Sequence, residues 1–170
     1  MLLATCGGLA KFNITQGGSA TIPGATLLEQ LVGDVGFGNF ASFDITQSQE
    51  LKNQGVKREQ ITSVKLTKLS IEVTSPANGQ DLTFIDSLTF FVESPGVAKK
   101  EIAKGGPFTA GATKADLTLV DLELAPYAAA PSMTFTTAAT GKRPSNTTTL
   151  DAKATITAEA NLAGLVCGPK

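Results

Sequence analysis

Any chemistry in this chain has to be carried out without histidine, which is absent from its 170 residues. Histidine is the side chain that most often titrates near neutral pH, and it is the commonest metal ligand in proteins. Its absence argues against most triad hydrolases and zinc enzymes. The remaining candidates for chemistry are two cysteines, Cys6 and Cys167, and a set of scattered carboxylates.

Cys6 follows Leu3-Ala4-Thr5 and precedes two glycines. The stretch resembles the end of a bacterial lipoprotein signal, where a lipidated cysteine becomes the mature N-terminus, although Thr5 stands where Gly, Ala or Ser is usual. The basic region and most of the apolar region of such a signal are missing. On this interpretation residues 1–8 are a signal remnant or N-terminal tail, and residues 9–170 form a single domain.

Two alternatives for the cysteines stay open. Cys6 could form a disulfide with Cys167, since domain termini often lie close together and a bridge across nearly the whole chain would add about 4–5 kcal/mol in the loop-entropy model. A lipidated thiol cannot form that bridge, so these two interpretations exclude each other. Alternatively, both cysteines are incidental small apolar residues. Lipidation and a disulfide both imply export.

Other motifs offer little chemistry. The stretch from Gly106 to Lys114 resembles a phosphate-binding loop, but Ala112 stands where the lysine should be, so a loop between strands is the better interpretation. No G-x-S-x-G or S-x-x-K motif is present. The carboxylates have no calcium-loop spacing. The carboxylates considered are Asp34, Asp44, Asp81, Asp86, Asp116, Asp121 and Glu123.

Composition excludes several classes of partner. The net charge is -1, with 17% charged residues and no basic run, so an electrostatic nucleic-acid footprint is absent. No stretch reaches the roughly 18–20 apolar residues of a transmembrane helix, so membrane attachment is expected only through a lipid at Cys6. We expect no cofactor and no metal.

The chain alternates between apolar and polar residues, with Gly, Pro and Asn between the runs, which predicts β-strands. Residues 12–22 predict an N-terminal hairpin that turns at Gly17-Gly18. Residues 26–32 predict a helical turn or two, and Phe43 and Ile45 begin a further strand. A short helix is expected from Ser48 to Asn53, with Leu51 buried and Gly55 as its stop.

Later segments give clearer strands. Residues 61–74 form the longest one, but its alternation slips near Thr67-Lys68, which predicts a bulge or bend. Further strands are expected in residues 84–93, 97–103, 117–119 and 133–135, with a helical turn at 121–127. Tyr127 is expected to pack at a corner with its hydroxyl bonded. Residues 150–160 form a half-buried strand with an alanine-rich inner face, which large side chains must fill.

The segment from Leu27 to Phe43 combines weak secondary structure with many large apolar side chains. If exposed, it would be an interaction patch; if folded back, it would plug one end of the molecule. The plug is favoured because Leu and Phe in such numbers usually reach the core. The patch candidates are Leu27, Leu28, Leu31, Phe37 and Phe40, with Val32 and Phe43 beside them.

Eight or nine strands with short turns predict an all-β chain, an antiparallel β-sandwich of the immunoglobulin-like or Greek-key type with one or two short helical turns. A closed barrel is the second choice. The pattern of residues 61–66 and 69–73 resembles that of uncharacterised bacterial envelope proteins, many of them lipoproteins. The resemblance continues through residues 82–92 and through Leu122 with Tyr127. It implies a β-sandwich and export, and no activity.

These observations predict a non-catalytic, exported or envelope-anchored β-sandwich that binds or scaffolds another cell-surface component, a surface protein or a glycan. Two alternatives are a carbohydrate-binding module and a structural subunit of a surface assembly. The absence of tryptophan and the single tyrosine count against the first of these, because sugar-binding modules usually stack sugars on exposed aromatic rings.

Overall fold

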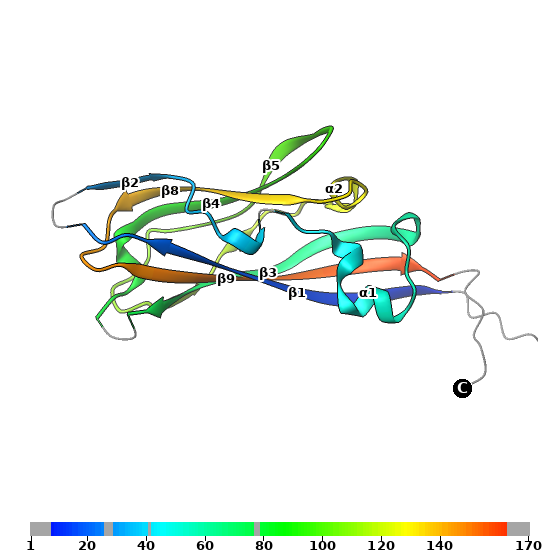
Figure 1. The fold of residues 1–170 in the computed structure, drawn as a ribbon, viewed down its shortest axis with the longest axis horizontal. Coiled ribbons are helices and arrows are strands. Elements are labelled where there is room, and N and C mark those ends of the chain that lie inside the picture. The colour runs from blue at the N-terminus through cyan, green and yellow to red at the C-terminus, as the bar shows by residue number, and fades with distance from the viewer. Residues whose placement is uncertain (1–7, 26–28, 41, 77–78, 163–170) are drawn as a thin grey trace, which may run out of the picture.

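A computed structural model describes residues 8–25, 29–40, 42–76 and 79–162. They form two antiparallel sheets packed face to face, with most connections crossing from one sheet to the other (Figure 1). The predicted β-sandwich is thus confirmed. In the described part of the chain, no helix is long and apolar enough to cross a bilayer.

The strands of the four-stranded sheet are, in spatial order, β1 (Leu9–Ile22), β9 (Thr148–Asn161), β3 (Ile61–Ser75) and β6 (Lys114–Asp116). Those of the five-stranded sheet are β2 (Gln30–Gly33), β8 (Thr134–Lys142), β4 (Ile85–Ser94), β5 (Val97–Gly105) and β7 (Thr118–Leu119). The described α-helices are α1 (Gln49–Asn53) and α2 (Ala125–Ala128). The described 3-10 turns are η1 (Gly38–Phe40), η2 (Ile45–Gln47), η3 (Arg58–Gln60) and η4 (Leu82–Phe84).

Strand β9 lies in the middle of the four-stranded sheet and supplies the alanine-rich inner face that its alternation predicts. It pairs with β1 on one side and β3 on the other. Its inward residues are buried: Leu150, Ala152, Ala154, Ile156, Ala158 and Ala160. Phe40, Phe90 and Phe135 lie around Ala154. The small side chains on β9 therefore leave room for the large rings opposite, as close packing requires.

Strand β3 contains the bulge that its slipped alternation predicts. Its register against β9 shifts between Leu66 and Lys68, so that Leu69 and Ile71 return to the core after the shift. A bulge adds one residue to a strand, so the alternation shifts by one in the sequence while the residues on both sides of the bulge still bury the same face of the sheet. The sequence pattern thus located a real irregularity to within a residue.

The N-terminal hairpin prediction is wrong. β1 runs unbroken through Gly17 and Gly18 and pairs with β9 along its whole length. Gly18 faces inward, and a Cβ atom built on it would lie 2.6 Å from Cδ2 of Phe40. Residue 18 therefore has to be glycine because the ring of Phe40 comes so close. Close approach of another group is a second reason for a glycine in a sequence, besides a turn of the chain.

Three further predictions were wrong because tertiary contacts override local preference. A helical turn was expected in residues 26–32, but Gln30–Gly33 forms strand β2, which pairs with β8. Phe43 makes only an isolated bridge to Met133, and a 3-10 turn follows it. The expected strand at residues 117–119 is divided at Leu117, where the chain leaves β6 in one sheet for β7 in the other.

The smaller features were predicted more accurately. Helix α1 follows Ser48 and buries Leu51, and Gly55 comes after it with a φ of 63°. Tyr127 in α2 is buried and donates its hydroxyl hydrogen to the carbonyl of Ala98 at 2.9 Å. The corner predicted from a single tyrosine beside a proline is therefore present.

The apolar segment before Phe43 is folded back, so Phe37 and Phe40 are not part of an exposed patch. They are 4% and 1% exposed. The ring centroids of Phe37 and Phe90 are 5.5 Å apart, and those of Phe40 and Phe135 are 5.7 Å apart. The segment closes a long side of the sandwich between β1 and β8, where we had expected it at one end (Figure 1).

The rest of the expected patch divides differently. Leu31 is half-buried against the core, whereas Val32, on the opposite face of β2, is 74% exposed. Leu27 and Leu28 lie outside the described residues. Among the residues that the structure describes, no two neighbouring members of the expected interaction patch are both exposed.

Candidate functional site

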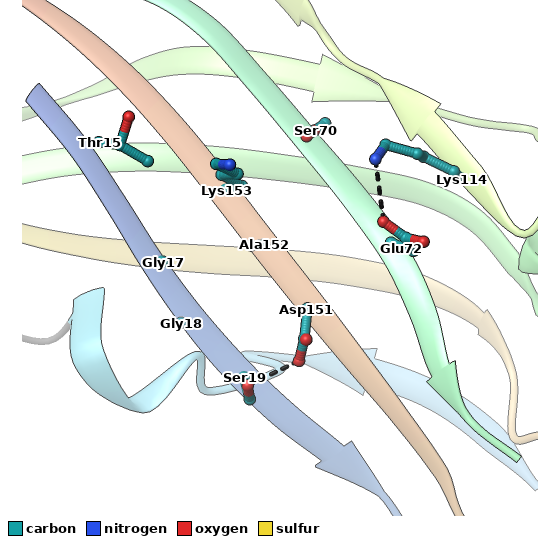
Figure 2. Close-up of a pocket in the computed structure, with 10 residues that line it drawn as sticks. All are labelled: Thr15, Gly17, Gly18, Ser19, Ser70, Glu72, Lys114, Asp151, Ala152 and Lys153. Carbon is teal, nitrogen blue, oxygen red and sulfur yellow. Dashed lines mark hydrogen bonds and ion pairs between the residues drawn. The ribbon is translucent and has the colours of Figure 1, made fainter. Parts of the chain in front are cut away.

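The outer face of the four-stranded sheet carries a shallow depression of about 310 Å³, termed here the outer groove, and most of its lining residues have polar or charged side chains (Figure 2). Four strands contribute to it, and the contributing residues are separated by up to 138 positions (Thr15 to Lys153). Its lining residues are Thr15, Gly17, Gly18, Ser19, Ser70, Glu72, Lys114, Asp151, Ala152 and Lys153.

Charged groups of both signs surround the outer groove. Nζ of Lys114 donates to Oε2 of Glu72 at 2.9 Å, and Oγ of Ser19 donates to Oδ1 of Asp151 at 2.6 Å. The hydrogen bond to Glu72, together with the charge of Glu72, raises the pKa of Lys114. Such a lining can donate and accept hydrogen bonds, so it suits a polar ligand.

The outer groove was not evident from the sequence, where Lys114 drew attention only at the end of a stretch that resembles a phosphate-binding loop. Residues 106–113 form the expected connection between strands, and Lys114 is the first residue of β6. Leu82 holds this connection by donating its N–H to the carbonyl of Ala112. The one available signal was Gly17. In a strand with the parity of β1, residue 17 faces outward, and a glycine there leaves a gap in the row of side chains.

A second depression of about 560 Å³, termed the edge groove, lies between β1 and the start of α1. Its walls are mostly uncharged and polar, and Oγ of Ser48 is buried there without a partner among the described residues. The residues that line it are Ile14, Thr15, Gln16, Ser42, Phe43, Asp44, Gln47, Ser48, Gln49, Glu50, Pro131 and Ser132. It borders the side of β1 that faces away from β9.

The carboxylates that we considered for chemistry lie apart from one another, and several hold the backbone. In the described part of the chain, no three acidic or cysteine side chains gather as metal ligands would. Asp81 accepts the N–H groups of Thr83 and Gly111, and Glu123 accepts those of Val64 and Ala125. These side chains stabilise loops, which is sufficient reason for their presence.

Asp34 and Asp44 have the same structural use. Burial by itself raises the pKa of each carboxyl, but hydrogen bonds outweigh it and the net pKa is lowered in both. For Asp34 the donors are the hydroxyl and N–H of Thr137 and the N–H of Gly36. For Asp44 they are the hydroxyl and N–H of Thr46, with the Arg58 guanidinium adding its charge.

These lowered pKa values predict acid sensitivity. A carboxyl with a folded-state pKa below its unfolded value stabilises the fold above the unfolded value, about 3.9 for Asp, and that stabilisation is lost as the pH falls through the folded pKa. We expect the urea midpoint to be flat near neutral pH and to fall below about pH 4. Urea denaturation across this range measures it. Asp34→Asn should flatten the acid slope relative to that of the unchanged protein, and equal slopes for the two proteins would contradict the assignment.

The two cysteines lie outside the described residues, so their chemistry stays a prediction. The ends of the described chain are adjacent, because Leu162 donates its N–H to the carbonyl of Gly8 at 3.2 Å. Cys6 comes two residues before Gly8, and Cys167 comes five residues after Leu162. Each cysteine is therefore tethered by a few residues to the same end of the four-stranded sheet.

Comparison with known proteins identifies no family. No protein-family model matches the chain, and no curated protein matches it. Solved structures similar to it include a decameric BFDV capsid protein, with a TM-score of 0.48 and 9% identity over 90% of this chain and 99% of that one. A 60-mer BFDV capsid protein matches with a TM-score of 0.43 and 12% identity over 96% of this chain and 98% of that one. At such scores the likeness has no bearing on function.

Proposed function

We propose that this chain is an exported, non-catalytic β-sandwich that binds or scaffolds another component of the cell surface. The observation that carries the proposal is the outer groove: an open site on a regular sheet face, lined mostly by polar and charged side chains. Binding sites usually combine a rigid framework with a few placed polar groups, and this sheet face provides both.

The non-catalytic part of the proposal is supported by what the carboxylates do. Asp34, Asp44 and Glu123 each accept backbone N–H groups, and each has a lowered pKa. A general acid needs a carboxyl whose pKa is raised toward the working pH. These three side chains are therefore tuned for holding loops in their charged form.

The export part rests on Cys6 and on the resemblance to bacterial envelope proteins. Lipidation of Cys6 would anchor the four-stranded sheet to a membrane by the end at which Gly8 and Leu162 meet. A disulfide between Cys6 and Cys167 would close the same end. Both arrangements leave the outer groove free, since it lies along the face of the sheet.

A second candidate, a structural subunit of a surface assembly, is favoured by β1. This edge strand has 14 residues, one charged side chain, Lys11, and no register shift against β9. The other sheet edges are short: β2 has four residues, β6 three and β7 two. Long, regular edges with few charges are the ones that accept another strand, and here the part of β1 that η1 and α1 do not contact would be available for it.

Binding to native cells tests the proposed function. We expect the purified chain to bind saturably to washed cells of its own organism, and the native protein to fractionate with the envelope. Intact mass of the native protein then separates a lipid on Cys6 from a disulfide. Sedimentation velocity of the same preparation separates the candidates, because a structural subunit should associate as concentration rises. A cytosolic, monomeric protein that does not bind cells would overturn both.

A further inference from the structure

Gly18 must be glycine because the ring of Phe40 packs against it, but no such packing requires a glycine at residue 17. Gly17 lies in the interior of β1 and faces outward, and a Cβ atom built on it would meet only the carbonyl oxygen of Ala152, at 3.7 Å. The fold would therefore accept a side chain there. Glycine inside a strand weakens it, and where no packing requires it, glycine often marks a place that a ligand approaches closely. Gly17 is in the lining of the outer groove (Figure 2).

Ser70 gives independent support. It is only 6% exposed as a residue, and it lines the outer groove. Its hydroxyl oxygen is not among the enclosed, unpartnered side-chain atoms of the described residues, so we take it as open to a ligand that lies in the groove. Its neighbour across the ladder is Lys153, an exposed lysine with no acidic partner in the described part of the chain.

The other half of the groove carries two acids directly opposite each other. Glu72 of β3 pairs in register with Asp151 of β9, and of these two acids only Glu72 has a lysine partner among the described residues. Like charges directly opposite destabilise a sheet. Carboxylates in this position accept hydrogen bonds from neutral donors, as Asp151 already does from Ser19. A ligand with several hydroxyl groups would supply such donors.

We propose that the outer groove binds an acidic saccharide, a sugar unit that carries a carboxylate. No aromatic ring of the described residues lines the groove, so recognition rests on hydrogen bonds and charge and not on the ring stacking usual in carbohydrate-binding modules. Its hydroxyl groups donate to Asp151 and Glu72, and its carboxylate lies against Lys153 and the hydroxyl of Ser70, above Gly17. A neutral sugar would leave Lys153 unused, and a simple anion would leave the two acids unused. This inference rests on the proposed function and names the chemistry of the component that is bound.

Titration calorimetry with trigalacturonic acid tests the proposal. Lys153→Gln should lower the affinity about tenfold, since it removes one charge-assisted hydrogen bond. Gly17→Thr should abolish binding while leaving the thermal midpoint equal or higher, because threonine suits an outward strand position. Lys100→Gln makes the same change at an exposed lysine of β5, in the other sheet, and should leave binding unchanged.

Each contrary result has a distinct meaning. Maltotriose binding as tightly as trigalacturonic acid, or tripolyphosphate binding as tightly with the same loss in Lys153→Gln, would overturn the acidic saccharide. Full binding by Gly17→Thr would place the ligand elsewhere and overturn the site. Absence of trigalacturonic acid binding in a protein that still binds native cells would overturn this inference and leave the proposed function standing.

Discussion

Gly18→Ala is expected to lower the free energy of unfolding by about 2–3 kcal/mol, whereas Gly17→Ala leaves it unchanged or slightly higher. The two glycines are adjacent in β1 but face opposite sides of the sheet. The added methyl group at residue 18 would lie 2.6 Å from Cδ2 of Phe40, while the one at residue 17 meets only a carbonyl oxygen at 3.7 Å.

Phe40 cannot move away cheaply from a methyl group at residue 18. It is 1% exposed, and edge-on contacts with Phe37, Phe90 and Phe135 surround it. Overpacking such a site forces rings off their preferred rotamers or shifts the backbone. The energy cost of Gly18→Ala should therefore be set mostly by Phe40.

Urea denaturation of the unchanged protein and four variants measures this effect. Besides Gly18→Ala, Gly17→Ala and Phe40→Leu, the double variant Gly18→Ala/Phe40→Leu should lose less stability than the sum of its two single changes, since neighbours that clash are non-additive. Equal midpoints for the two alanine variants would show that Phe40 does not pack on β1, and the close approach would then have to be abandoned.

Arg58→Ala is the second change with a large expected effect, about 2–3 kcal/mol of lost stability. Arg58 begins η3 and joins three separate segments. Nη2 lies 3.0 Å from each carboxylate oxygen of Asp44, while Nη1 donates to the carbonyls of Ala128, the last residue of α2, and of Ala130, two residues after it. The side chains of Arg58 and Asp44 are 26% and 24% exposed, so solvent screens the pair only in part.

Removing Arg58 leaves several acceptors unsatisfied at once. The last carbonyl groups of a helix have no N–H donor within the helix, and a cationic side chain nearby can donate hydrogen bonds to them. The Asp44 carboxylate would also remain charged among fewer donors. Breaking one partner of a partly buried network costs more than the pair itself is worth.

Arg143→Ala is the matched control, because it also removes an arginine from an ion pair. Nη1 of Arg143 lies 3.0 Å from Oε2 of Glu29, but the two side chains are 39% and 54% exposed. Exposed pairs contribute less than about 1 kcal/mol. Thermal and urea midpoints of both variants test this prediction. If Arg58→Ala loses no more stability than Arg143→Ala, Arg58 does not stabilise the fold by joining these segments.

The strands with an uninterrupted pattern were predictable from the sequence. β9 was located by strict alternation over residues 150–160, and the bulge in β3 by a single slip at Thr67-Lys68. Both signals are local, because a strand with one buried face must alternate wherever it lies in the fold. Helix α1 was equally local, since Ser48 before it, its buried leucine and its glycine stop lie within eight residues, although the Ser48 side chain makes no capping hydrogen bond.

The outer groove could not be predicted in this way. It brings Gly17, Ser70, Lys114 and Lys153 onto one face, and only the order of strands in the sheet makes them neighbours. β1 shows the same limit within one strand. The alternation of Phe12, Ile14, Ala20 and Ile22 continues through the two glycines, yet a glycine pair read locally indicates a turn.

The sequence by itself determined that this chain buries one face of each strand, because a period of two is a property of neighbouring residues. Tertiary structure alone decided which strand lies beside which, and with it the use of each glycine: Gly18 admits the ring of Phe40, 22 residues further along the chain, and Gly17 opens a groove. The physical reason is that side-chain facing is set by backbone geometry, whereas a clash or a gap exists only between elements that packing has brought together.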